Sequence, residues 1–186
     1  VGNWNGTTGA DDTAAIQAAI AACPTGGIVW FPNGNYKITA ELAPPRPMTL
    51  AGNPGGAQLS MATTNTNHIR IGDGTEITRN ARLNVTVQGL TFAPSTGVTA
   101  FTSGACIRVQ YGAFVTIEKC AFYGADGTKK LWNGIELDRC EDRWIRDCRA
   151  RQLKSSALYT YGASGIANRT VDVVIDRFRT PANDGD

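Results

Sequence analysis

Four acidic residues lie where their carboxylates could do glycan chemistry. Glu118, Glu136, Asp138 and Asp176 alternate with apolar residues in short β-rich runs, a pattern that predicts outward-pointing side chains. Hydrolysis of a glycosidic bond uses two carboxyl groups, about 5–5.5 Å apart for retention and about 6.5–9.5 Å apart for inversion. Because Glu136 and Asp138 flank Leu137 on one predicted strand, we expect both to project from the same outer face. The alternative interpretation is that all four are solvated surface carboxylates.

A basic segment, RCEDRWIRDCRARQLK, spans residues 139–154. Trp144 is predicted to point outward, where its indole could stack on a sugar ring. Arg143 and Arg146 are the candidates for binding an acidic glycan. The alternative is that these arginines pair with the interleaved acids and that Trp144 packs at a subunit interface. The six basic residues are Arg139, Arg143, Arg146, Arg149, Arg151 and Lys154, and the acids among them are Glu141, Asp142 and Asp147.

The histidine and the cysteines predict no metal centre and no cofactor. An odd number of cysteines without a CxxC pair favours neither a disulfide framework nor a four-thiolate zinc site, so we interpret all five as reduced core residues. His68 has no Ser or Cys partner at a spacing diagnostic of a catalytic triad, and we expect it on the surface or in a loop. The cysteines are Cys23, Cys106, Cys120, Cys140 and Cys148.

The composition indicates a folded domain rich in turns. The 186 residues are 42% hydrophobic and 18% charged, with 21 glycines, which excludes a highly charged disordered tail. A net charge of +2 argues against a strongly basic nucleic-acid binder, so we expect no nucleic-acid partner. No run approaches the roughly 18 apolar residues of a membrane-spanning helix. The chain opens on Val1 without a signal-peptide pattern, and we expect a processed product or a piece of a longer chain.

One helix is expected near the start, followed by strands only. Asp11 and Asp12 are N-cap candidates, Ile16 and Ile20 share one helical face, and Pro24 ends the run, which predicts a helix over 11–23. The β-rich runs that follow are bounded by Gly, Asn, Asp or Pro. They include 28–31, 36–39, 48–51 and 69–71.

An internal repeat organises the later strands. The segments 85–92, 115–122, 143–150 and 173–180 align with one apolar column, and its members are spaced by 30, 28 and 30 residues. A second apolar column precedes it in each repeat, so each repeat is expected to hold two strands. Such units bury their apolar faces when they stack about 4.8 Å apart in parallel register, which predicts a β-solenoid. A β-sandwich, with a hairpin at Asn33–Gly34, is the competing interpretation. The first column is Val87, Ile117, Ile145 and Ile175, and the second begins at Ile69, Ile107, Ile135 and Leu158.

The beginning of the chain resembles the pectate-lyase-like single-stranded right-handed β-helix superfamily. The segment GADDTAAIQAAIAAC (9–23) followed by GGIVWFPNGNYKIT (26–39) is similar to the capping helix and first coil of that superfamily. The resemblance implies an all-β, right-handed parallel β-helix with an N-terminal capping α-helix. We expect a single β-helix domain over 1–186, with the helix at 11–23 and coils over 26–180. About six repeats fit, fewer than in a complete enzyme of this kind, so we expect a part of a longer chain or assembly.

The resemblance implies three alternative functions. The opening motif is frequent in bacteriophage tailspikes, which implies a homotrimeric spike of a virion, assembled in host cytoplasm with other particle proteins, that binds and in some cases depolymerises bacterial surface polysaccharide. A secreted polysaccharide lyase or glycoside hydrolase is the second alternative. Lyases of the superfamily use a basic residue beside carboxylate-held calcium, which Arg146 between Glu118 and Asp176 would loosely suit. A purely structural β-helix of a particle is the third.

Overall fold

The computed structural model describes residues 9–72, 83–96, 98, 101–111, 113–124, 131–161 and 173–180. Within these ranges the chain is all-β apart from one helix, and its strands form three parallel sheets. The six-stranded sheet contains β1 (Ile28–Phe31), β3 (Met48–Gly52), β6 (Val85–Gln88), β9 (Ala113–Glu118), β12 (Glu141–Arg146) and β15 (Val173–Asp176). The five-stranded sheet contains β2 (Gly34–Ile38), β4 (Ala57–Met61), β7 (Leu90–Pro94), β10 (Ala121–Tyr123) and β13 (Arg149–Arg151). The four-stranded sheet contains β5 (Ile69–Ile71), β8 (Ala105–Gln110), β11 (Asn133–Asp138) and β14 (Leu158–Tyr161).

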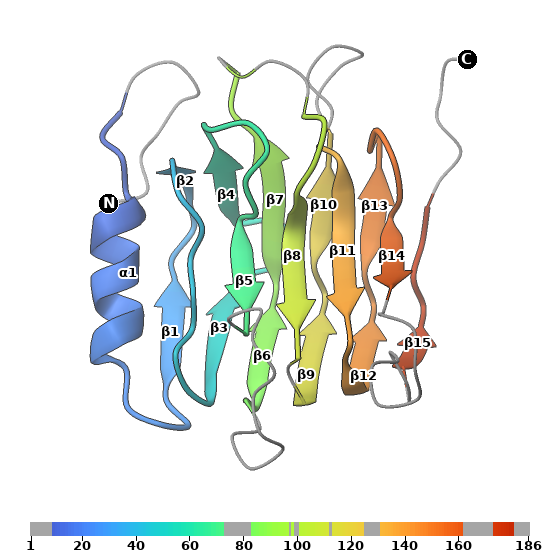
Figure 1. Cartoon of the computed structure of the whole chain (residues 1–186). Helices are drawn as coiled ribbons and strands as arrows, with labels where there is room; N and C mark the ends of the chain where they lie inside the picture. The colour runs from blue at the N-terminus through green and yellow to red at the C-terminus, as the bar shows by residue number, and fades with distance from the viewer. Residues whose placement is uncertain are drawn as a thin grey trace.

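The chain visits the three sheets in turn, and each passage through them makes one coil. Figure 1 shows successive coils stacked side by side, from β1 and β2 next to the helix to β15 at the other end. Every strand pairs in parallel with the equivalent strand of the neighbouring coil. This β-helix-like arrangement confirms the predicted stacking in parallel register. The expected hairpin at Asn33–Gly34 is wrong, because β1 and β2 lie in different sheets.

The predicted apolar columns are interior ladders. Val87 is in register with Ile117, and Ile117 with Ile145, each almost fully buried. The column continues to Ile175 in β15, which is 51% exposed. The second column is confirmed in the same way by the pairs of β5, β8, β11 and β14. The expectation of two strands per repeat was incomplete, because the five-stranded sheet adds a third ladder. In it Phe92 and Phe122 stack with 5.4 Å between ring centroids, and Phe178, which follows β15, stacks on Phe122 at 6.5 Å.

A left-handed residue makes the sharp bend between the six-stranded and five-stranded sheets in four consecutive coils. These residues are Gly89, Lys119, Asp147 and Arg177, with φ between 50° and 68°. Glycine is needed at the first of these positions for a second reason. A Cβ on Gly89 would lie 2.1 Å from the carbonyl oxygen of Gly52, closer than any real contact.

Helix α1 (Thr13–Ala22) lies at the N-terminal end of the stack, beside β1 and β2 (Figure 1). Ile16 and Ile20 are buried in the same core cluster as the strands, as their spacing predicts. The helix is shorter than the expected 11–23. Asp12 is the N-cap residue but makes no side-chain cap, and Asp11 instead accepts a hydrogen bond from the Thr13 N–H at 3.0 Å.

The five cysteines are free and buried, which confirms their interpretation as core residues. Three of the thiols donate to a carbonyl oxygen of the preceding coil: Cys120 to Val87, Cys140 to Val109 and Cys148 to Ile117. His68, in contrast, was expected on the surface and is fully buried against Phe92. In the described part of the chain, no helix is long and apolar enough to cross a membrane.

Candidate functional site

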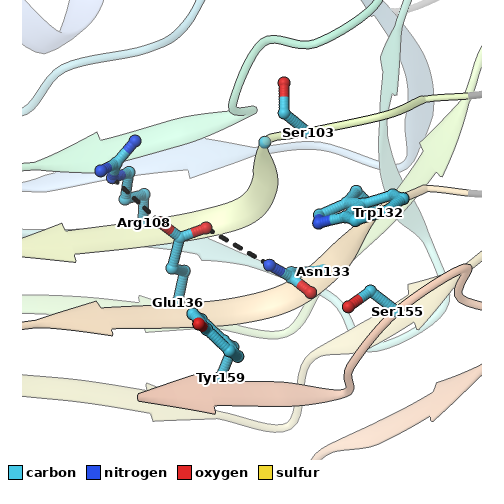
Figure 2. A pocket seen from close by; sticks show the side chains of 8 residues that line it. Ser103, Arg108, Trp132, Asn133, Glu136, Ser155 and Tyr159 are labelled. Carbon is cyan, nitrogen blue, oxygen red and sulfur yellow. Dashed lines mark hydrogen bonds and ion pairs between the residues drawn. The ribbon is translucent and has the colours of Figure 1, made fainter. Parts of the chain in front are cut away.

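A pocket of about 420 Å³ opens on the outer face of the four-stranded sheet (Figure 2). Its walls come from β8, β11 and β14 and from the segments that lead into these strands. We call it the Glu136 pocket, after the carboxylate at its centre. Its lining residues are Ser103, Gly104, Arg108, Trp132, Asn133, Glu136, Ser155 and Tyr159.

Strand register places the charged groups of the pocket in one outward row. Arg70, Arg108, Glu136 and Tyr159 are successive partners across β5, β8, β11 and β14, and each of the first three lies between two buried apolar neighbours. Arg108 Nε lies 3.3 Å from Glu136 Oε1, so the guanidinium and the carboxylate form an ion pair across neighbouring coils. Glu136 is 7% exposed, which makes its carboxylate a partly desolvated group rather than a free surface charge.

Asn133 holds the second oxygen of that carboxylate. Its Nδ2 donates to Glu136 Oε2 at 3.4 Å, and its Oδ1 accepts the Ser156 N–H of the next coil at 3.1 Å. Asn67 has the equivalent role two coils earlier: its Nδ2 donates to the carboxylate of Glu41 at 3.1 Å, and its Oδ1 accepts the Ala105 N–H of the next coil at 2.9 Å. A buried asparagine that joins a carboxylate to the next coil fixes the carboxylate's orientation before any ligand binds.

Two aromatic rings border the pocket. Tyr159 follows Glu136 in the outward row, on the neighbouring strand β14, and is 46% exposed. Trp132 precedes β11 and is partly buried, and Lys154 Nζ lies over its ring at 5.6 Å from the centroid. In Figure 2 the indole lies beyond Asn133 as seen from the Glu136 carboxylate, while the phenol lies beside Glu136. The pocket therefore offers flat apolar surface next to a fixed carboxylate.

Asp138 shares strand β11 with Glu136 but has different partners. Arg139 reaches its two oxygens at 2.8 and 3.0 Å, and Gln110 Nε2 donates to it at 3.3 Å. The expectation that Glu136 and Asp138 lie on one face is met, since both alternate with inward apolar residues. The alternative that they are solvated surface carboxylates is wrong, because both are buried.

The other two candidate carboxylates lie on the six-stranded sheet, apart from the Glu136 pocket. Glu118, Arg146 and Asp176 are successive register partners, as the repeat alignment predicted. Arg146 pairs with Glu118, and Asp176 pairs with Arg177 at 2.7 Å. The structure therefore divides the four predicted carboxylates into two groups on different sheets. Among the residues described, no three His, Cys, Asp or Glu side chains come together as a metal site.

Of the three candidate sugar-binding residues of β12, two are exposed on the outer face and one is buried. Trp144 is 52% exposed on the outer face, as expected, and Arg146 is also exposed. Arg143 is 1% exposed, which corrects the expectation that it meets a glycan. Strand parity explains the difference, because Arg143 lies two residues before the inward Ile145 and pairs in register with the buried Val115.

Sequence reasoning missed most of the residues around Glu136. Tyr159 could have been found, since the aligned second column places it opposite Glu136. The shared position of Asn67 and Asn133, each two residues before an inward isoleucine, was a second available signal. Trp132 lies outside any strand pattern, and nothing in the sequence places it beside Glu136.

Comparisons with known proteins agree on the fold. ORF18 of Geobacillus virus E2 superposes with a TM-score of 0.51 at 14% identity, over 94% of this chain and 46% of that chain. The catalytic domain of a GH87 α-1,3-glucanase variant in complex with tetrasaccharides superposes with a TM-score of 0.53 at 15% identity, over 93% of this chain and 36% of that chain. The chain thus spans less than half the length of either structure, and likeness at this identity establishes the fold alone.

The family is established by sequence. No curated protein matches the chain. A family model described as "Rhamnogalacturonase A/epimerase, pectate lyase-like" matches residues 3–175, nearly the whole length. The chain therefore belongs to the pectate-lyase-like rhamnogalacturonase A/epimerase family.

Proposed function

We propose that the chain is a glycan-binding part of a phage or phage-like particle spike, and that the Glu136 pocket binds one sugar of a bacterial surface polysaccharide. The observation that carries the proposal is the meeting of Trp132, Tyr159 and an ion-paired, nearly buried carboxylate in one pocket. Family membership and the folds of a phage protein and a glucanase domain support the choice of a glycan as ligand.

The pocket has the groups that sugar recognition requires. A pyranose ring offers an apolar face, which an aromatic ring covers, and hydroxyl groups, which need acceptors and donors. Glu136 supplies the acceptor, while Arg108, Ser103 and Ser155, which line the same pocket, supply a guanidinium and two hydroxyl groups. Because Arg108 and Asn133 already hold the carboxylate, little side-chain entropy is lost when a sugar binds.

The proposal includes an assembly. We propose one right-handed β-helix domain over 1–186 that α1 caps at its first coil, forming part of a longer chain or assembly. Three copies form a parallel homotrimer, and other particle proteins attach it to a virion assembled in host cytoplasm. The buried side chains of Ile16 and Ile20 support the capping role, since they close the apolar interior at the N-terminal end.

Binding to purified surface polysaccharides, measured by titration calorimetry, tests the pocket. Trp132→Ala and Tyr159→Ala should each weaken binding by about tenfold, because each removes an aromatic wall. Trp144→Ala is the matched control, since it removes an exposed indole from the six-stranded sheet. Loss of binding in Trp144→Ala alone would overturn the Glu136 pocket and favour the six-stranded sheet, where Arg146 is the neighbouring cation.

A second candidate function is hydrolysis of the bound glycan. Glu136 and Asp138 are two residues apart on β11, a separation of about 6.6–6.8 Å along a strand. This is the spacing of their Cα atoms, and two carboxyl groups that leave one face of a strand at this spacing can adopt the roughly 6.5–9.5 Å separation that inverting glycosidases use. A secreted lyase or hydrolase, with Glu118, Arg146 and Asp176 as the other group of candidates, remains the alternative to a spike.

Incubation with the polysaccharides that bind distinguishes these functions. New reducing ends that disappear in Glu136→Gln and in Asp138→Asn would support hydrolysis at β11. Unsaturated sugars that disappear in Arg146→Gln would support a lyase on the six-stranded sheet. Binding without either product would leave a receptor-binding spike, and neither binding nor product would favour the structural β-helix.

A further inference from the structure

A second groove lies on the five-stranded sheet, at the end of the stack formed by β13 and the segment after β15. Its volume is about 840 Å³. Three exposed arginines surround it, and the buried Ala150 and partly buried Phe178 contribute to its lining. We call it the arginine groove and define it by Tyr123, Arg149, Arg151 and Arg179.

Backbone pairing brings the three arginines together. Arg149 and Arg151 are two residues apart on β13, so both side chains leave the same outer face about 6.6–6.8 Å apart. Arg179 is the bridge partner of Arg149 in the next coil, about 4.8 Å away across the sheet. The Arg179 N–H donates to the Cys148 carbonyl at 2.9 Å, and the Ala150 N–H donates to the Arg179 carbonyl at 2.9 Å. The cluster thus rests on hydrogen-bonded backbone.

The charge of this cluster is uncompensated in the described part of the chain. Five other arginines form ion pairs with carboxylates: Arg70, Arg108, Arg139, Arg146 and Arg177. Arg149, Arg151 and Arg179 have no carboxylate partner among the described residues, although Arg149 and Arg179 are direct neighbours across the sheet. Like charges placed opposite each other destabilise a sheet, and a bound anion would remove that cost.

Tyr123 orients two of the guanidinium groups. Its ring lies 5.4 Å from the guanidinium carbon of Arg149 and 4.8 Å from that of Arg151. Tyr123 is also the register partner of Arg151, so the stacking follows from the strand pairing. Guanidinium groups held by an aromatic ring keep their N–H groups free to bind carboxylate or phosphate in a bidentate manner.

We infer that the arginine groove is a second ligand site, distinct from the Glu136 pocket, that takes the oxyanion substituents of an anionic polysaccharide. Carboxylate and phosphate groups share the required geometry. The inference rests on the proposed function in so far as the ligand is a glycan. In this proposal the arginine groove on the five-stranded sheet binds the charged substituents of the polysaccharide, whereas the Glu136 pocket on the four-stranded sheet binds the sugar ring.

Binding of four probes to the full chain tests the inference. The probes are alginate oligosaccharides for carboxylate, phosphorylated dextran for phosphate, neutral dextran, and a single-stranded oligonucleotide. Arg149→Gln combined with Arg151→Gln removes two charges from the groove. The matched control combines Arg177→Gln with Lys119→Gln, which removes two charges from exposed positions outside the groove. Circular dichroism verifies that each variant is folded.

We expect one or both anionic saccharides to bind more tightly than neutral dextran, and to bind about tenfold more weakly to the Arg149/Arg151 variant than to the control. Added salt should weaken that binding. The inference is overturned if both variants lose the same amount of saccharide affinity or if neither anionic saccharide binds more tightly than neutral dextran. It is also overturned if the oligonucleotide binds most tightly of the four probes. Loss of saccharide binding in Trp132→Ala with none in the arginine variant overturns this site and leaves the Glu136 pocket supported. The reverse result overturns the pocket and supports the groove.

Discussion

Lowering the pH from about 7.5 to about 4.5 should cost the folded protein about 2.5 kcal/mol through a single side chain, His68. The imidazole is fully buried, and its ring meets Phe92 edge to face at 5.5 Å between centroids. Its Nε2 lies 3.0 Å from the Ala93 carbonyl oxygen and therefore carries the proton that it donates. Among the described residues, Nδ1 has no hydrogen-bond partner. Protonation would place a second N–H and a positive charge in this interior.

Burial lowers the pKa of His68 from 6.5 to about 4, against the weaker opposing effect of the Ala93 hydrogen bond. The unfolded chain therefore takes up a proton at a higher pH than the folded chain. Stability is complete above about pH 6.5, falls as the pH drops toward 4, and levels off below it. With these two pKa values, the loss at pH 4.5 is about 2.5 kcal/mol, a large part of the stability of an ordinary domain.

Urea unfolding at both pH values, followed by tryptophan fluorescence, measures the effect. Carboxylates also titrate in this range, so the informative quantity is the difference between the native protein and His68→Gln, which keeps an amide donor and does not titrate. The native protein should lose about 2.5 kcal/mol more than His68→Gln between the two pH values. Equal losses in the two proteins would show that His68 titrates normally and would refute the burial argument.

Three other changes follow from the same packing. Ile117→Asp should abolish soluble folded protein, because it places a carboxylate in the interior ladder, whereas Thr116→Asp on the outer face should fold. Soluble expression and circular dichroism compare the two variants, and folding of both would contradict the repeat register. Asn133→Ala should lower the free energy of unfolding by about 1–3 kcal/mol, since the Ser156 N–H and Glu136 each lose a partner; an unchanged urea midpoint would contradict this. The thiols should react with a disulfide reagent only after unfolding, because all five are buried and burial raises the pKa of Cys106 well above its ordinary value; rapid labelling of the native protein would be the contrary result.

Much of the fold could be predicted from the sequence because a stacked coil repeats its environments. Equivalent positions in successive coils meet the same neighbours, so apolar residues such as Val87, Ile117 and Ile145 recur at nearly constant spacing. This spacing indicates both where a strand lies and which of its faces points inward. Alternation along β11 likewise predicted that Glu136 and Asp138 share an outer face. The sequence therefore determined the parallel stack, the core ladders, the burial of the cysteines and the side of the sheet on which each carboxylate lies.

The environment of individual polar residues was decided only by the tertiary structure. His68 has no local sign of burial, and its partners Phe92 and Ala93 come from the next coil. The Glu136 pocket depends on Arg108, 28 residues earlier, and on Tyr159 in the following coil, while Trp132 enters it from outside any strand. Contacts between coils join residues that are far apart along the chain, whereas periodicity reports only which face a residue takes. The physical reason is that a side chain's burial and charge partners depend on what the neighbouring coils place over it, and only folding sets that.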